Sequence, residues 1–197
     1  APRQQGTPVS LTEAAGGTWL APGVLLVERR IPLTRRQGTV HLGAGLAALA
    51  SLAQRVLGQV GEPSGWRLLD TETSGLAGGT GTWVFACGLG RPEGECLVLA
   101  QYLLARLDAE PAFLAALSEA LAGCELLVSF NGKSFDLPLL ATRLRLAGLR
   151  AGFDRLPHLA RQLRHDAVER RHDRVLHLHR LHDHQRVAGR DDRAGRR

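Results

Sequence analysis

The order of short apolar runs between residues 66 and 148 is the feature that most constrains what this chain can fold into. Glycine, proline and polar residues bound each run, and the length of a run separates predicted strands from predicted helices. The predicted elements are strands at 66–71, 82–88 and 95–104, a helix opened by Pro111 and closed by Gly123, a strand at 125–130 and a helix stopped by Gly148. Strands in succession, then helix, strand and helix, predict a mixed α/β sheet with helices packed on it.

The residues before this group have weaker patterns, and two glycine-containing segments lie between the predicted strands. A helix is expected where leucines and other apolar residues recur with helical spacing and where a glycine then ends the pattern. These expectations are strands at 24–31 and 39–42, a helix over 46–57 that ends near Gly58, a loop at 76–81 and a turn at 91–94.

Charge and composition divide the chain into three parts. Residues 1–17 are rich in Gly, Pro and small polar residues and predict a flexible arm, followed by an α/β domain over 18–157 with its core at 64–157. Residues 1–157 hold 14 Lys and Arg against 13 Asp and Glu, a net charge of +1, whereas 158–197 hold 11 Arg against 6 acids, a net charge of +5, with seven of the eight histidines. We expect this basic tail to be poorly ordered or marginally helical.

Composition also excludes several classes of protein. The 197 residues suffice for one domain with a core, and no run approaches 18 apolar residues, so no membrane span or membrane partner is expected. The three cysteines, Cys87, Cys96 and Cys124, are odd in number and never form C-x-x-C. They predict reduced thiols in a cytoplasmic protein. The nearly neutral body means that net charge alone does not indicate nucleic-acid binding.

Two acids follow each other closely at the end of a predicted strand. Asp70 and Glu72 are two residues apart, so a strand would project both carboxylates to the same side. Close carboxylates repel each other, and a divalent ion such as Mg²⁺ or Mn²⁺, which prefers hard oxygen ligands, relieves the repulsion. The alternative is that Asp70 caps a turn and Glu72 is merely solvated.

A third acid follows another apolar strand. Asp136 closes the segment NGKSFD and opens a predicted helix, where the N-terminus favours an anion. Taken alone, it is an ordinary helix N-terminal acid. Together with Asp70, Glu72 and the nearby Asn131, it suggests phosphodiester hydrolysis with two metal ions, which stabilise the attacking and the leaving oxygen.

These segments carry a family resemblance. LLDTETSGLAGGTGTWVFACGLG and LLVSFNGKSFDLPLLATRL resemble the YprB-type ribonuclease H-like domain of the DnaQ-like (DEDD) 3′–5′ exonuclease superfamily. Its D-x-E and N-x-x-x-F-D motifs match Asp70/Glu72 and Asn131/Phe135/Asp136, and the match covers about residues 24–157. The resemblance implies a ribonuclease H-like fold and a metal-dependent nuclease that acts on DNA or RNA ends.

The resemblance also implies roles for single residues. Asp70 would bridge the two ions, Glu72 would hold the ion on the nucleophile side, and Asp136 would bind the other ion directly or through water. The implied substrate-binding residues are Thr71, Gly78, Gly79, Thr80, Asn131 and Lys133. An ordinary glycine turn and a solvated Lys133 are the alternatives, and the glycine spacing fits neither a Walker loop nor a dinucleotide fingerprint.

The resemblance ends near Pro157, so the C-terminal part of the fold is expected to be incomplete. The superfamily needs a fourth acid there, and His179 to Asp183 has H-x-x-x-D spacing, which is a weak match in so His- and Asp-rich a tail. We hypothesise that 158–197 is a frameshifted or aberrantly terminated end. The histidines at 177, 179, 182 and 184 also allow a zinc site, but their spacing favours an exposed basic tract.

Two functions follow from the sequence. The first is a metal-dependent nuclease, most simply a 3′–5′ exonuclease on single strands. The second is a catalytically inactive nucleic-acid-binding remnant, because the fourth acid is missing and the tail is basic. The sequence does not choose between DNA and RNA or between exo- and endonuclease action.

Overall fold

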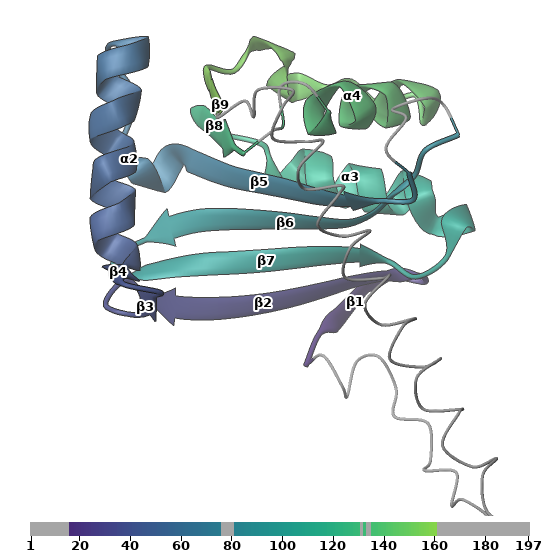
Figure 1. Ribbon diagram of the computed structural model, residues 1–197. Coiled ribbons are helices and arrows are strands. Elements are labelled where there is room, and N and C mark those ends of the chain that lie inside the picture. The colour runs from purple at the N-terminus through teal and green to yellow at the C-terminus, as the bar shows by residue number, and fades with distance from the viewer. Residues whose placement is uncertain (1–15, 76–80, 131, 133–134, 161–197) are drawn as a thin grey trace, which may run out of the picture. The chain divides into compact units, whose positions relative to one another are not determined.

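The computed structural model describes residues 16–75, 81–130, 132 and 135–160, which all belong to one compact unit that spans residues 1–161. Within these residues the chain forms a seven-stranded sheet in the order β1-β2-β7-β6-β5-β8-β9 (Figure 1). Its strands are β1 (Thr18–Ala21), β2 (Val24–Pro32), β5 (Trp66–Thr73), β6 (Val84–Glu93), β7 (Cys96–Leu104), β8 (Leu126–Ser129) and β9 (His158–Ala160). A small hairpin pairs β3 (Arg36–Gln37) with β4 (Val40–His41).

The sheet is mixed because β5 has one antiparallel and one parallel neighbour. It pairs antiparallel with β6 and parallel with β8, and β8 pairs parallel with β9. A parallel neighbour needs a crossover connection, which α3 (Glu110–Ala120) provides between β7 and β8. The predicted mixed sheet flanked by helices is thus confirmed.

The larger core lies between one face of the sheet and two helices, α3 and α4 (Asp136–Leu146). Both helices lie behind the sheet in the view of Figure 1. The strand residues of this core include Leu69, Cys87, Leu89 and Tyr102, and the helix residues include Phe113, Leu114, Leu117, Leu139, Leu140 and Leu144. No helix among the described residues covers the opposite face in the same way.

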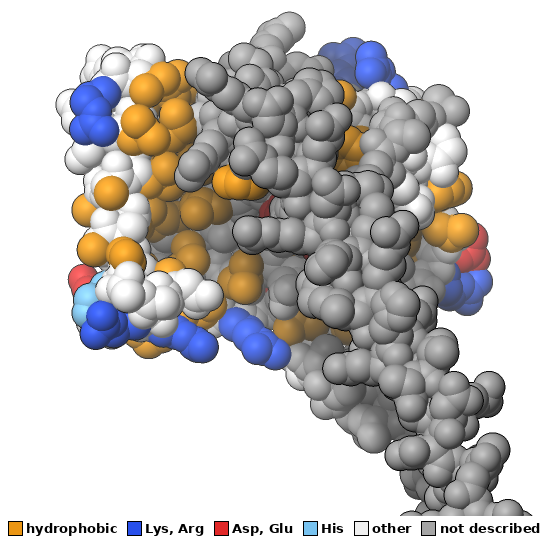
Figure 2. All heavy atoms as spheres, viewed as in Figure 1, with side chains coloured by type: hydrophobic (Ala, Val, Ile, Leu, Met, Phe, Trp, Pro, Cys, Tyr) orange, Lys and Arg blue, Asp and Glu red, His pale blue; other side chains and the backbone are white. Residues whose placement is uncertain are grey.

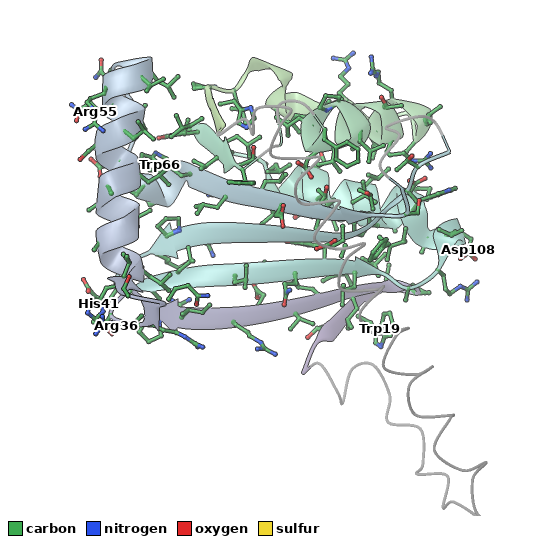
Figure 3. The ribbon with its side chains drawn as sticks, viewed as in Figure 1. Trp19, Arg36, His41, Arg55, Trp66 and Asp108 are labelled. Atoms are coloured by element: carbon green, nitrogen blue, oxygen red, sulfur yellow. The ribbon has the colours of Figure 1, made fainter. Side chains whose placement is uncertain are left out.

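A second, smaller core anchors α2 (Leu42–Leu57) at one end of the sheet, where the helix stands across the strands (Figure 1). Trp66 at the start of β5 is 1% exposed and packs with Ala53 of α2 and Leu126 of β8. Figure 3 shows Trp66 between α2 and the sheet. Its indole Nε1 donates a hydrogen bond to the carbonyl of Gly61 at 2.9 Å, which satisfies the one polar atom of this buried ring.

The turn between β6 and β7 differs from the prediction. The sequence predicted a turn at 91–94, but β6 continues to Glu93 and the turn consists of Gly94 and Glu95. The prediction placed Pro92 in the turn because proline lacks the amide hydrogen that a residue inside a sheet donates. The β5 ladder ends at Gly90 of β6, so Pro92 has no partner strand on that side and the missing donor costs nothing.

The observed bounds of several other helices and strands differ from the predicted bounds by a few residues. The strand predicted at 82–88 begins at Val84, the helix predicted at 46–57 begins at Leu42, and the strand predicted at 39–42 is reduced to Val40–His41. β1 was not predicted, and β9 begins at His158, within the stretch assigned by composition to the tail. None of the described helices is long and apolar enough to cross a membrane.

Candidate active site on the central strand

β5 places two carboxylates on the sheet face that α3 and α4 do not cover. Asp70 pairs in register with Gly88 of β6, and Glu72 pairs with Ala86. These small neighbours leave both acids exposed, and both line a cavity of about 420 Å³. The predicted same-side projection of Asp70 and Glu72 agrees with this arrangement.

The residue between them points to the other face. Thr71 is paired with the buried Cys87, on the side of the sheet that packs against the helices. Its hydroxyl donates a hydrogen bond to the carboxylate of Asp136, which lies in the first turn of α4 and is 6% exposed. The positive end of the helix dipole also favours an anion at this position.

The structure therefore brings the predicted site residues together in two pairs. Asp70 and Glu72 share a cavity, and Thr71 and Asp136 share a hydrogen bond. Among the described residues, no group of three His, Cys, Asp or Glu side chains lies close enough to hold a metal ion. Gly78, Gly79, Thr80, Asn131, Lys133 and the 179–183 segment lie outside the described residues.

The buried thiol of Cys87 lies within the electrostatic reach of one acid from each pair. The pKa of the Cys87 thiol is raised to about 12, first because the group is buried and then because Asp136 and Asp70 place negative charge near it. A thiol with this pKa is neutral at pH 7, so it is neither a nucleophile nor a metal ligand there. The carboxylates of Asp70 and Asp136 act on the same buried group from β5 and α4.

A buried serine shapes the turn that leads into α4. The Oγ atom of Ser129 accepts a hydrogen bond from the amide of Gly132 at 2.9 Å and lies 2.8 Å from Nε2 of His158. A Cβ atom at Gly132 would lie 2.3 Å from the same Oγ atom, so the turn requires glycine. Sequence analysis missed Ser129 and His158; the only available signal was a polar residue at the end of an apolar strand.

A second buried cluster connects α3, α4 and the neck of the loop after β5. Arg143 is 4% exposed, its Nε atom donates to Oε1 of Glu110 at 2.6 Å, and its guanidinium lies 4.0 Å from the centroid of the Trp83 ring. Trp83 and Ser74 exchange two hydrogen bonds of 2.9 Å, which close the neck of the glycine-rich segment. Sequence analysis did not identify this cluster either, because its members are far apart in the chain.

Two of the three predicted acids are placed as ligands of a hard divalent cation. Asp70 and Glu72 offer exposed oxygen ligands of the kind that Mg²⁺ and Mn²⁺ prefer. Asp136 is buried and one of its carboxylate oxygens accepts from Thr71, so a shared ion would compete with that bond, use the other oxygen or bind through water.

Comparisons with known proteins agree with this fold. A sequence model of the RNase H superfamily matches residues 68–182, which is more than half of the chain. The chain therefore belongs to the RNase H superfamily, and this membership suggests a nuclease-type function on nucleic acid, commonly with divalent metals.

The comparisons also support the more specific resemblance. The uncharacterized protein YprB of Bacillus subtilis (strain 168) is 32% identical over 125 residues, which are 60% of this chain and 30% of YprB. A YprB-type ribonuclease H-like domain is thus confirmed. The chain spans less than a third of the length of this relative.

Proposed function

We propose that this chain is a divalent-metal-dependent nuclease that hydrolyses phosphodiester bonds of nucleic acid as a 3′–5′ exonuclease. The observation that carries the proposal is that Asp70 and Glu72 are both exposed on the sheet face that α3 and α4 do not cover, in a cavity of about 420 Å³. Membership of the RNase H superfamily supports it. A pair of Mg²⁺ or Mn²⁺ ions would supply the activation of water and the neutralisation of phosphate charge.

The side chains of this site divide the work between them. Asp70 and Glu72 would hold the ions, and the hydroxyl of Thr71 keeps the Asp136 carboxylate at the start of α4, close to β5. The proposed substrate contacts also include Thr71, Gly78, Gly79, Thr80, Asn131 and Lys133.

An exposed aromatic ring supports a single-stranded substrate. Phe130 is 46% exposed and lines the same cavity as Asp70 and Glu72. A nucleobase that has left a duplex stacks favourably on such a ring, by about 1–3 kcal/mol. A frayed or single-stranded end would therefore bind this site better than an intact duplex.

We also propose that the protein works in the cytoplasm. All three cysteines, Cys87, Cys96 and Cys124, are free, and thiols persist in a reducing compartment.

The second candidate is a nucleic-acid-binding remnant without catalysis. It is favoured by the separation of the acids into two pairs and by the absence of a three-acid group among residues 16–160 outside the gaps of the structure. Salt-sensitive binding without cleavage is the behaviour it predicts.

The deciding experiment is a cleavage assay with 5′-labelled single- and double-stranded oligonucleotides in Mn²⁺, Mg²⁺ or EDTA. We expect stepwise shortening from the 3′ end of single strands, dependent on metal and abolished by Asp70→Asn. Glu119→Gln, which removes an exposed carboxylate on α3, is the matched control and should cleave normally. Cleavage by Asp70→Asn at the wild-type rate contradicts the proposal, and binding without cleavage by the wild type supports the remnant.

A further inference from the structure

The sheet face that α3 and α4 do not cover holds a second cavity that adjoins the one with the acids. This second cavity has a volume of about 700 Å³, and Arg29, Arg30 and Arg35 line it. Leu97, Leu99 and Gln101 of β7 line both cavities. The two cavities therefore adjoin along β7, and together they form what we call the trough, with carboxylates at one end and arginines at the other.

Strand register gives the direction and length of the trough. Leu68, next to the acids on β5, lies in one row with Gly90 of β6, Leu99 of β7 and Arg29 of β2. Three steps between neighbouring strands at about 4.8 Å each give a length of roughly 14 Å. The middle of the trough crosses β6, which lines the first cavity on this face with the small residues Gly90, Gly88 and Ala86. Leu99 of β7 is the larger side chain of this row.

The arginine end of the trough carries positive charge that is available to a ligand. The ion pairs of the described residues occupy Arg30, which binds Glu93 at 2.8 Å, but include neither Arg29 nor Arg35. Figure 2 shows Lys and Arg side chains along the lower edge of the molecule, over β2 and β3. The chain's own residues 158–197 carry a net charge of +5, which disfavours them as the occupant of this end.

We propose that a single nucleic-acid strand, whose end lies at Asp70 and Glu72, crosses β6 and β7 at right angles to the strands and that Arg29 and Arg35 bind its phosphates. A length of about 14 Å corresponds to roughly four nucleotide steps of a stacked strand at 3.4 Å each. The position of the reacting end rests on the proposed nuclease function, whereas the strand path requires binding alone.

Binding measured without metal tests the path separately from catalysis. The full chain is titrated into fluorescein-labelled oligothymidylate of about ten nucleotides in EDTA, and anisotropy is followed over a range of salt concentrations. The Arg29→Ala/Arg35→Ala double variant should bind about tenfold more weakly, and the slope of log K against log salt should fall by about 1.4, or roughly 0.7 for each phosphate contact.

The matched control removes two arginines from elsewhere on the surface. Arg55 is exposed on α2, as labelled in Figure 3, and Arg150 is exposed in the segment that follows α4. The Arg55→Ala/Arg150→Ala variant should keep both the affinity and the salt slope.

Three results would overturn the strand path. They are unchanged binding by the trough variant, an equal loss in the control variant, and competition by polyglutamate as strong as that by the oligonucleotide, which would indicate an acidic protein partner. Two combinations of results separate the strand path from the nuclease proposal. If the Arg29→Ala/Arg35→Ala variant binds more weakly but Asp70→Asn does not affect cleavage, the nuclease proposal fails and the path stands. If Asp70→Asn abolishes cleavage and the arginines have no effect on binding, only the path fails.

Discussion

Thr71 donates a hydrogen bond from its hydroxyl to the carboxylate of Asp136, which joins the central strand β5 to the first turn of α4 across 65 residues of sequence. The same strand presents Asp70 and Glu72 on its opposite face. One strand thus fixes three acids, two directly and one through the hydroxyl between them.

Loss of this hydrogen bond should reduce activity more than it unfolds the protein. Thr71→Val keeps the shape of the side chain but leaves the buried carboxylate without its donor, at a cost of about 1–3 kcal/mol in the free energy of unfolding. Misplacement of Asp136 should lower metal-dependent cleavage by about 10–100-fold, as is typical when a group that orients a metal ligand is removed.

Thr71→Ser is the control, since it retains the hydroxyl and should keep most of the activity. Urea unfolding and cleavage rates of both variants check the prediction. Full activity in the valine variant would contradict the prediction, and equal loss in the serine and valine variants would show that the hydroxyl alone does not account for the effect.

Gly132 should tolerate no side chain. A Cβ atom there would lie 2.3 Å from Ser129 Oγ and 2.7 Å from Ser129 Cβ, so Gly132→Ala must displace the buried serine that contacts His158. We expect a loss of about 1–3 kcal/mol in the free energy of unfolding, as overpacking of a filled site usually costs. Gly152→Ala is the matched control, because nothing lies within 4 Å of the added atom. Denaturant midpoints that fall equally in both variants would contradict this account.

The buried ion pair between Arg143 and Glu110 should be costly to break on one side only. Arg143→Met leaves the Glu110 carboxylate buried and uncompensated and removes the contact with the Trp83 ring. Such a loss typically costs about 3–5 kcal/mol. The Glu110→Leu/Arg143→Met double variant removes both charges and should recover much of that stability, as thermal and urea unfolding would show. A double variant no more stable than Arg143→Met would contradict the assignment of the loss to the uncompensated Glu110 carboxylate.

Alkaline pH should destabilise the fold through Cys87. Its pKa is raised from 9.0 to about 12 in the folded protein, so between these values the unfolded chain loses the thiol proton while the folded chain keeps it. Stability from this group is complete below pH 9 and falls by about 1.4 kcal/mol for each pH unit above it. Cys87→Ala should flatten the loss of stability between pH 9 and pH 10.5 in urea titrations. A slope that does not change on substitution would contradict the assignment.

Much of the fold was predictable from local pattern. The apolar runs at β5, β7 and β8 are bounded by turn residues, and α3 and α4 have a proline or an acid near the start and a glycine shortly after the end. β1 was not predictable because its four residues form a strand by pairing with β2 and have no strand pattern of their own. β6 extends beyond Gly90 to Glu93 because its last residues pair with β7 alone, and no local pattern in the sequence records this pairing.

The candidate site was predictable to a lesser extent. The two-residue spacing of Asp70 and Glu72 on a strand predicted that both would share a face, and the structure places both in one cavity. The spacing did not reveal that Asp136 would bond to Thr71 on the other face, since that contact depends on how α4 packs. The Arg143 cluster with Glu110 and Trp83 was missed for the same reason.

Direct measurement of Mn²⁺ binding tests the central claim without reference to any substrate. Free Mn²⁺ is followed by its electron paramagnetic resonance signal while the full chain is added. We predict saturable binding by the wild type and by Glu119→Gln, at least tenfold weaker binding by Asp70→Asn and Glu72→Gln, and unchanged folding by circular dichroism in all four proteins. Binding that both site variants retain in full, or no Mn²⁺ binding by the wild type at all, would contradict the claim that β5 carries a divalent-cation site.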